Sequence, residues 1–403
     1  MNIGIFTDTF IPQINGVATS ISMLEKELRA LGHNVYIFTT TDPKAKKSEG
    51  NIIRLPSMPF VFMPQARVTL AYPPSVLNKI RKYKLDIVHT HTEFALGFFG
   101  KAVSTALKIP LIHTYHTLWE EYVHYIARGY LIKPAGARKF SKFFCECAKV
   151  VVTPTEKSRD LLVSYGVSRS IKIIPTGIDF EPFLRGPNSE TEIKTLKRSL
   201  GIAEDSYVIT FIGRVAKEKN IDIILHTMPE IIKSLPNAIL LIVGDGPVRE
   251  NLEKLVKELN IDKNVIFAGF RPWSTIGKYY HIADIFTSAS ETETQGLTYI
   301  EAMAAGTPVV AKFDASIEGI IKHKETGYFF YDNNDIAETI INALENKEER
   351  ANIAITARNS IKHLSSKEFA KNMEILYQQV CRAYPKKTKK FFDKFVFWNQ
   401  KNV

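Results

Sequence analysis

The first 38 residues carry the pattern that decides the fold, and they read MNIGIFTDTFIPQINGVATSISMLEKELRALGHNVYIF. Residues 2–6 form a short apolar, β-prone run before a polar loop, as in a buried parallel strand. Next, the apolar residues Ile21, Leu24, Leu28 and Leu31 recur at helical spacing. This pattern predicts a helix that ends before Gly32. Residues 35–38 predict a second strand, so this segment is one β-loop-α-β unit.

The same alternation continues along the chain. In the first half, further strands are predicted at residues 86–90, 111–114, 149–152 and 171–174. In the second half they are predicted at residues 207–212, 239–243, 265–267, 285–286 and 308–311. Strands that alternate with helices build parallel, doubly wound sheets, so we expect an α/β protein with two Rossmann-like domains. Ligands bind at the carboxyl ends of such strands, and two facing edges would form an inter-domain cleft.

The length of 403 residues also fits two domains. We expect an N-terminal domain at residues 1–180, a linker at 181–206, a C-terminal domain at 207–375, and a C-terminal helix with a basic, aromatic tail at 376–403. Hydrophobic residues at 45% and charged residues at 24% are ordinary for a globular protein, which excludes disordered and fibrous classes.

The N-terminal sequence lacks the basic and apolar regions of a secretory signal, and no apolar stretch is long enough to span a membrane. The three cysteines fit reduced thiols better than a disulfide framework. We therefore expect a cytoplasmic protein.

The net charge of +11 is concentrated in two segments. Residues 57–146 carry a balance of +7 and residues 382–403 a balance of +6, so the rest of the chain is close to neutral. Basic segments suit a polyanion, either nucleic acid or the anionic leaflet of a membrane, unless they are simply solvated faces. For the tail, membrane contact, packing against the N-terminal domain and disorder all stay open.

Two of the strand-end loops suggest phosphate binding. Asn15 and Gly16 precede the first helix, where glycine lets backbone N–H groups approach an anion, although a plain tight turn is the alternative. The dinucleotide fingerprint G-x-G-x-x-G is absent there, which argues against a nicotinamide enzyme. In the second half, a strand runs into Gly213 and Arg214, with Lys219 five residues on, and this pair of cations predicts a diphosphate clamp.

A second glycine turn follows the strand at residues 239–243. Glycine and proline at residues 244–247 meet the needs of a tight turn, so this loop is mainly structural. Gly246 is also a candidate for close approach to a ligand.

The most specific motif is SASETETQGLTYIEAMAAGTP, residues 288–308. Glu293 lies in the loop after a strand, and Gly296 and Leu297 begin a helix whose first-turn N–H groups would face a phosphate. Glu301 follows inside an apolar helix, where burial of a carboxylate needs a partner such as a pair of ribose hydroxyls. A glutamate that simply faces water is the alternative.

Four histidines gather at two neighbouring strand ends: His89, His91, His113 and His116. A zinc site is one interpretation. Because acidic or cysteine co-ligands show no clear pattern nearby, hydrogen bonding of a histidine to a substrate is the favoured one.

Together these motifs resemble the retaining glycosyltransferases of family four, which have the GT-B fold of two facing Rossmann-like domains. The resemblance runs from residue 1 to about residue 383, although Asn15-Gly16 stands where the family has two glycines. It implies that His116 contacts the transferred sugar, that Glu293 holds sugar hydroxyls and Glu301 the ribose. It also implies that Arg214, Lys219 and helix N-termini stabilise the leaving diphosphate without a metal ion or other cofactor.

The segment around HTYHTLWEEYVHYI, residues 113–126, is similar to the bacterial diacylglycerol glucosyltransferases. This similarity implies UDP-glucose as donor, diacylglycerol as acceptor, an α-linked glycolipid as product, and anionic lipids as partners on the inner face of the cell membrane. The expected membrane contacts are aromatic and basic residues of the first domain: Phe60, Phe62, Arg67, Lys79, Arg81, Lys82, Lys84, Lys139 and Lys142.

Three alternatives stay open. Another donor or a soluble acceptor would keep the family and change the substrate. A nucleotide-sugar epimerase of the same fold would convert its substrate without an acceptor. A basic nucleic-acid-binding protein would bind with a steep salt dependence and without UDP affinity, and the glutamates near the expected cleft argue against it.

Overall fold

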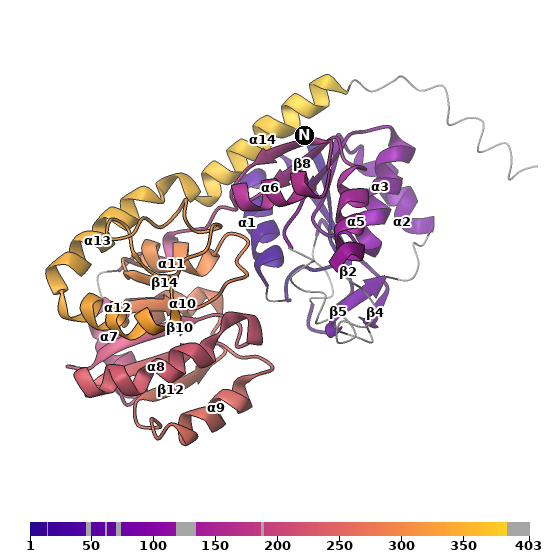
Figure 1. Cartoon of the computed structure of the whole chain (residues 1–403). Coiled ribbons are helices and arrows are strands. Elements are labelled where there is room, and N and C mark those ends of the chain that lie inside the picture. Colours follow the sequence, from indigo (N-terminus) through magenta and orange to yellow (C-terminus); the bar gives the residue numbers. More distant parts are fainter. Residues whose placement is uncertain are drawn as a thin grey trace, which may run out of the picture. The chain divides into compact units, whose positions relative to one another are not determined.

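The computed structural model describes residues 1–13, 15–45, 50–60, 63–69, 74–117, 134–186 and 189–384. The chain forms two compact units, which are drawn in Figure 1. Unit 1 contains Met1–Thr153, Leu162–Lys172 and the chain from Lys371 onward, whereas unit 2 contains Pro154–Leu161 and Ile173–Ala370. The end of the chain therefore returns to the unit in which the chain begins.

Unit 1 is built on a seven-stranded sheet with the order β3-β2-β1-β6-β7-β8-β9. The strands are β1 (Asn2–Phe6), β2 (Asn34–Thr40), β3 (Ile52–Leu55), β6 (Ile87–Thr90), β7 (Leu111–Thr114), β8 (Val150–Thr153) and β9 (Ser170–Ile173). The described helices are α1 (Gly16–Ala30), α2 (Pro74–Tyr83), α3 (Ala95–Leu107), α5 (Pro134–Cys145) and α6 (Glu156–Ser164), of which the first part of α6 belongs to unit 2. Strands β1, β2, β3, β6, β7 and β8 pair in parallel, as the sequence predicted.

Unit 2 is built on a six-stranded parallel sheet with the order β12-β11-β10-β13-β14-β15. The strands are β10 (Tyr207–Ile212), β11 (Ala238–Val243), β12 (Val265–Gly269), β13 (Ile285–Ser288), β14 (Val309–Lys312) and β15 (Tyr328–Phe330). The helices are α7 (Ser189–Ser199), α8 (Ile221–Ser234), α9 (Arg249–Glu258), α10 (Trp273–His281), α11 (Leu297–Ala305), α12 (Ile336–Glu345) and α13 (Lys347–Ser360). The fold class predicted from the sequence, two Rossmann-like parallel sheets, is confirmed.

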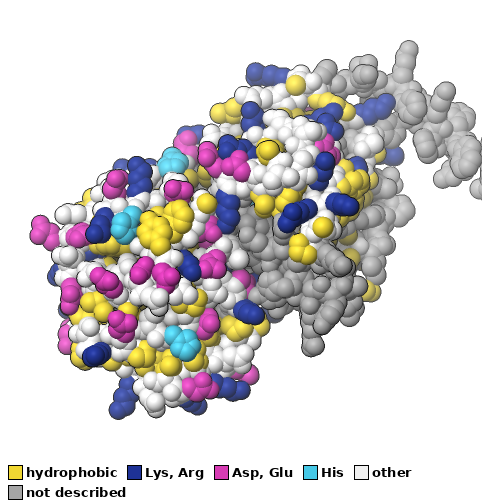
Figure 2. Space-filling view, in the orientation of Figure 1, with side chains coloured by type: hydrophobic (Ala, Val, Ile, Leu, Met, Phe, Trp, Pro, Cys, Tyr) yellow, Lys and Arg dark blue, Asp and Glu magenta, His cyan; other side chains and the backbone are white. Residues whose placement is uncertain are grey.

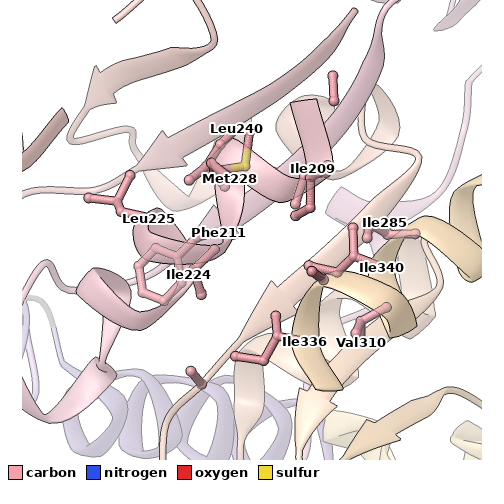
Figure 3. Close-up of a cluster of buried hydrophobic side chains, with 14 of the residues drawn as sticks. Ile209, Phe211, Ile224, Leu225, Met228, Leu240, Ile285, Val310, Ile336 and Ile340 are labelled. Carbon is pink, nitrogen blue, oxygen red and sulfur yellow. The ribbon is translucent and has the colours of Figure 1, made fainter. Parts of the chain in front are cut away.

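The core of unit 2 explains why its strands read as continuous apolar runs. Helices cover the sheet, so side chains on both faces are buried, and Leu240 and Leu241 on β11 are both fully enclosed. On one face, Ile224 and Met228 of α8 pack against Ile209 of β10 (Figure 3). Each such side chain contributes about 1.5–3 kcal/mol when fully buried.

Every strand predicted from an apolar run is present, with limits within two residues of those observed. The strands that the sequence pattern did not reveal are β3, β15 and the antiparallel hairpin of β4 (Ser57–Phe60) and β5 (Met63–Thr69). They are short or contain proline, so periodicity carried little signal for them.

The segment expected as a linker contains η3 (Glu181–Phe183) and α7. Helix α14 (Ser366–Ala383) closes the described chain, and its second part belongs to unit 1. The domain limits drawn from the sequence stay a prediction, and the tail after Tyr384 lies outside the described residues. No helix in the described part of the chain combines the length and the apolar character needed to cross a membrane.

Candidate active site

The sharpest sequence motif forms the β13–α11 turn of unit 2. Gly296 caps α11 with φ of +74°, a conformation that L side chains rarely adopt, and a Cβ there would lie 2.4 Å from the Tyr299 ring. The helix begins at Leu297, directly after Gly296, close to the predicted start, and its N-cap residue is a glycine that supplies no side-chain cap. This end of the helix has the geometry and the dipole of an anion site.

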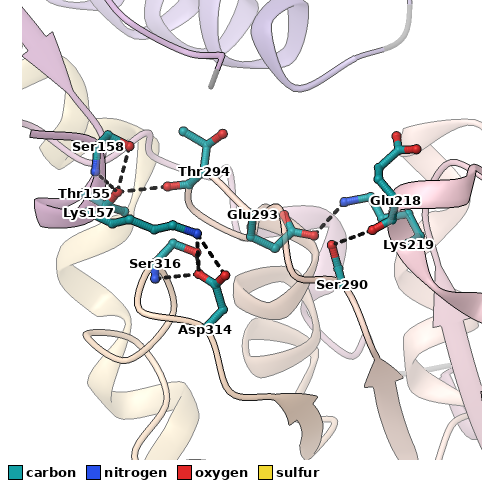
Figure 4. Close-up of polar contacts among 10 residues, drawn as sticks. All are labelled: Thr155, Lys157, Ser158, Glu218, Lys219, Ser290, Glu293, Thr294, Asp314 and Ser316. Atoms are coloured by element: carbon teal, nitrogen blue, oxygen red, sulfur yellow. Dashed lines mark hydrogen bonds and ion pairs between the residues drawn. The ribbon is translucent and has the colours of Figure 1, made fainter. Parts of the chain in front are cut away.

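Two of the predicted catalytic residues meet at this turn. The Lys219 ammonium lies 2.6 Å from a Glu293 carboxylate oxygen, and both side chains are mostly buried, with 20% and 12% exposed (Figure 4). Lys219 comes from η4 (Lys217–Lys219), which follows β10, and the chain separates the two residues by 74 positions. The structure thus brings the predicted phosphate ligand and the predicted sugar ligand into one contact.

Arg214 lies in the same loop after β10. Its guanidinium is paired with Glu218, whose side chain is nearly inaccessible, while 44% of the Arg214 side chain is exposed. Gly213 precedes it with φ of +157°, close to extended backbone. Both predicted clamp residues therefore have carboxylate partners in this structure: Glu218 in the same loop for Arg214, and Glu293 of the β13–α11 turn for Lys219.

Glu301 is buried on α11 and has a protein partner. Tyr280 of α10 donates a hydrogen bond to its carboxylate at 2.8 Å. Burial raises the pKa of Glu301 to about 7, although the Tyr280 hydrogen bond acts in the opposite direction. A glutamate that faces water is excluded, and Tyr280 is a partner of Glu301 that the sequence pattern did not reveal.

Gly246 has a structural explanation. A Cβ at this position would lie 2.2 Å from the carbonyl oxygen of Val215, so only glycine lets the β11–α9 loop pack on the loop after β10. Arg249 begins α9. The tight turn accounts for Gly246 without a ligand.

The loop that carries Glu293 is held by residues that the sequence analysis missed. The buried Gln295 amide accepts a hydrogen bond from the Thr176 N–H at 2.8 Å and donates one to the Thr176 carbonyl at 2.9 Å. Thr155 donates to the carbonyl oxygen of Thr294 at 3.0 Å (Figure 4). Because these contacts span more than 100 positions, only the tertiary structure reveals them.

In unit 1, Asn15 is the N-cap of α1. Its side chain accepts a hydrogen bond from the Ala18 N–H at 2.9 Å and donates one to the Thr9 hydroxyl at 2.7 Å. Gly16 is the exposed first residue of the helix. The loop is a capped helix start, which is compatible with the tight-turn interpretation and with anion binding.

The four histidines predicted to cluster lie at the ends of β6 and β7 in unit 1, and three of them form a hydrogen-bonded row. His91 Nδ1 lies 2.9 Å from His116 Nε2, and His91 Nε2 lies 3.1 Å from His89 Nδ1. His113 instead contacts Glu93 at 3.2 Å and Thr90.

Burial is the main cause that lowers the pKa values of His89, His91 and His116, to about 3 for His116, and the closeness of other histidines adds to the effect. The rings bond one another, and in the described ranges no three His, Cys, Asp or Glu side chains gather as metal ligands.

The predicted membrane contacts occupy different environments. Lys79, Arg81, Lys82 and Lys84 are exposed on and after α2, and Lys139 and Lys142 are exposed on α5. Arg67 instead donates to the Ser57 hydroxyl and carbonyl, so it braces the β4–β5 hairpin. Phe60 is half-buried, and Phe62 lies outside the described residues.

An aromatic and basic surface on α3 and α5 was not recognised from the sequence. We call it the α3–α5 surface, and it consists of Phe94, Phe98, Lys101, Lys139, Phe140, Lys142 and Phe143. The Phe98 ring contacts those of Phe140 and Phe143 in tilted arrangements, each with ring centres 6.3 Å apart. The Lys101 ammonium lies 5.2 Å from the centre of the Phe143 ring. Figure 2 shows Lys and Arg side chains beside hydrophobic ones over α5.

Two Rossmann-like units, with strand-end loops that are candidates for phosphate binding, form the architecture of the GT-B glycosyltransferases. Two family models match, Glycosyltransferase Family 4 over residues 14–182 and Glycosyl transferases group 1 over residues 192–360. The first half of the chain therefore belongs to Glycosyltransferase Family 4 and the second half to the group 1 glycosyl transferases.

Two curated relatives extend the match. The chain is 41% identical over 345 residues to the alpha-monoglucosyldiacylglycerol synthase of Streptococcus pneumoniae, covering 85% of this chain and 78% of that protein. It is 34% identical over 398 residues to the synthase of the same name from Acholeplasma laidlawii, covering 97% and 100%.

Solved structures share the fold at low identity. HepE from Anabaena, crystallised with UDP, aligns with a TM-score of 0.76 at 17% identity and covers 94% of this chain and 100% of that one. Sucrose-phosphate synthase from Thermosynechococcus elongatus aligns with a TM-score of 0.74 at 22% identity and covers 94% and 99%. The GT-B fold predicted from the sequence is confirmed.

Proposed function

We propose that this glycosyltransferase moves glucose from UDP-glucose to 1,2-diacylglycerol and forms an α-monoglucosyl diacylglycerol. The observation that carries the proposal is the match to two synthases whose names state this product, over 78% and 100% of their lengths. The fold neighbour crystallised with UDP supports the choice of donor class.

In the proposed mechanism, Lys219 and Arg214 neutralise the diphosphate as it leaves, together with the N–H groups at the start of α11. Glu293 accepts hydrogen bonds from sugar hydroxyls, and its contact with Lys219 holds both groups in place before the donor arrives. The Glu301 carboxylate holds the ribose, with Tyr280 fixing its orientation.

The acceptor hydroxyl attacks the sugar on the face from which the diphosphate departs, so the anomeric configuration is retained. The departing phosphate takes the proton of the acceptor, and therefore no pair of protein carboxylates acts as acid and base. Side chains and helix N–H groups stabilise the negative charge that develops on the leaving diphosphate. We therefore propose that the reaction needs no metal ion.

We also propose that the enzyme works at the anionic inner surface of the cell membrane through the α3–α5 surface and the cations of α2. Exposed phenylalanines enter the interface while lysines remain at the headgroups, and each lysine near an anionic surface contributes about 1 kcal/mol. Phe143 is 55% exposed, an unusual position for a large aromatic side chain unless it meets a partner.

The test of activity incubates the purified protein with UDP-[14C]glucose and diacylglycerol in anionic lipid micelles, with EDTA. We expect one labelled monoglycosyl lipid in the organic phase, and the small coupling constant of its anomeric proton would report the α linkage. Activity that appears only after Mg²⁺ is restored would contradict the proposal of metal independence.

Parallel reactions separate the alternatives. Transfer only from another nucleotide sugar, or only to a soluble sugar, would overturn the proposed substrates and keep the family. Conversion of UDP-glucose into UDP-galactose without an acceptor would identify an epimerase.

Membrane contact is tested by co-sedimentation with vesicles that contain phosphatidylglycerol. We expect the wild-type protein to bind. Phe143→Ser should weaken binding about tenfold, because one aromatic side chain that would enter the membrane interface is lost. Ile355→Ser is the control, since Ile355 is also a largely exposed hydrophobic residue but lies on α13 of unit 2. Equal binding by both variants would refute the role of the α3–α5 surface.

A further inference from the structure

The row of histidines in unit 1 continues to a tyrosine from the other end of the chain. The Tyr377 hydroxyl of α14 lies 2.7 Å from His89 Nδ1, and the two residues are 288 positions apart. His89 Nε2 lies 2.7 Å from the Thr114 hydroxyl. A single hydrogen-bonded path therefore connects Tyr377 with His116 through His89 and His91.

Burial favours the neutral form of the rings in this path. Burial lowers the pKa of His89, His91 and His116, and the closeness of neighbouring histidines acts in the same direction. The other groups that face the path are Glu93, which contacts His113, and Thr114, and the Tyr377 phenol keeps its proton because burial raises its pKa. A neutral imidazole has one N–H and one acceptor nitrogen, so the direction of each hydrogen bond fixes the next one.

Tyr377 sets the direction of the first bond. Its hydroxyl is fully buried, and among the described residues His89 is its one hydrogen-bond partner. A buried hydroxyl proton without an acceptor is costly, so the phenol donates its proton and His89 Nδ1 accepts it. His89 then carries its own proton on Nε2 and donates it to Thr114.

The remaining bonds follow from this start. His91 Nε2 lies 3.1 Å from the same His89 Nδ1, whose single lone pair already accepts from Tyr377. An unprotonated His91 Nε2 would be repelled by this electron-rich nitrogen, whereas an N–H there is a second, weaker donor to the same lone pair, so His91 carries its proton on Nε2. Its Nδ1 accepts in turn, and His116 must donate from Nε2. His116 Nδ1 is left without a proton, and no hydrogen bond to it is present within the described part of the chain.

We propose that Tyr377 is a positioning residue that, through His89 and His91, holds His116 in the Nε2–H tautomer, so that His116 Nδ1 accepts a hydrogen bond from a substrate hydroxyl. The role of His116 at the substrate rests on the proposed function. The tautomer itself does not, because it follows from hydrogen bonds within unit 1.

The experiment uses the full-length protein labelled with 15N-histidine, in which long-range correlation spectra distinguish Nε2–H from Nδ1–H tautomers. The His116 signals are assigned with His116→Gln. We expect wild-type His116 as a pure Nε2–H tautomer. Tyr377→Phe keeps the ring but removes the donor, so the row can reverse and His116 should show both tautomers.

Thr114→Val is the second variant, because it removes the acceptor of the His89 Nε2–H and also permits reversal. Tyr115→Phe is the matched control: its hydroxyl is also buried, but it bonds Ser141 and takes no part in the row. The control should keep the wild-type tautomer.

In glucosyl transfer, Tyr377→Phe should lower kcat/KM for the donor roughly tenfold, the size expected when one hydrogen bond to the substrate is weakened, whereas Tyr115→Phe should leave it unchanged. A wild-type His116 with its proton on Nδ1 would overturn the proposal, as would a pure Nε2–H tautomer in both Tyr377→Phe and Thr114→Val. A correct tautomer pattern without any glucosyl transfer would instead refute the proposed function and leave the row intact.

Discussion

Glu301→Gln tests the environment of the buried carboxylate on α11. The carboxyl pKa is raised from 4.5 to about 7 by burial, so the folded protein binds the proton more tightly than the unfolded chain does. The buried charge therefore lowers the free energy of unfolding. This loss is absent below pH 4.5, grows between pH 4.5 and 7, and is complete above pH 7.

The pKa change corresponds to about 3 kcal/mol of lost stability at pH 8. Glutamine has nearly the same volume, accepts the Tyr280 hydrogen bond, and never ionises. The stability of Glu301→Gln relative to the wild type should therefore rise by about 3 kcal/mol between pH 4.5 and 8, whatever constant offset the substitution adds.

The assay is urea unfolding of both proteins, followed by circular dichroism at several pH values. Glu258→Gln is the control, since Glu258 is exposed on α9 and its substitution should give no comparable slope. A relative stability of Glu301→Gln that does not change with pH would refute the reasoning.

The remaining predictions concern the same unit. Lys219→Met should lower kcat for glucosyl transfer at least about 100-fold, because the charge that meets the leaving diphosphate is lost, and steady-state kinetics with UDP-glucose measure it. Gln295→Met should destabilise unit 2 by about 2–4 kcal/mol in urea unfolding, because both backbone groups of Thr176 lose their partners. Gly244→Ala should cost about 3 kcal/mol in the same assay, since its Cβ would lie 1.8 Å from the carbonyl oxygen of Gly213. A wild-type result for any variant would contradict the contact on which it is based.

Local physics explains what the sequence predicted well. The parallel strands are buried on both faces and therefore read as short apolar runs, as at Tyr207–Ile212, where the predicted and observed limits agree. The start of α11 was predicted because Gly296 adopts a left-handed backbone conformation that favours glycine. Residues that carry such signals are close together in the chain, so one stretch of sequence contains the whole pattern.

The histidines show the limit of prediction from local sequence patterns. Their gathering was predicted because parallel strands end at the same edge of a sheet, but the order of the hydrogen bonds and the contact with Tyr377 were not. The α3–α5 surface was missed for a similar reason, since Phe98 and Phe143 belong to helices that sequence spacing does not bring together.

The sequence by itself determined the family, the two parallel sheets, and the loops where phosphate and sugar are expected to bind. The tertiary structure decided which charged and polar groups meet: Lys219 with Glu293, Tyr280 with Glu301, and Gln295 with Thr176. Backbone periodicity is a local property, whereas a hydrogen bond depends on the positions of two side-chain atoms to within about half an ångström. Those positions are fixed only when distant segments pack together, as α14 does when it brings Tyr377 to His89.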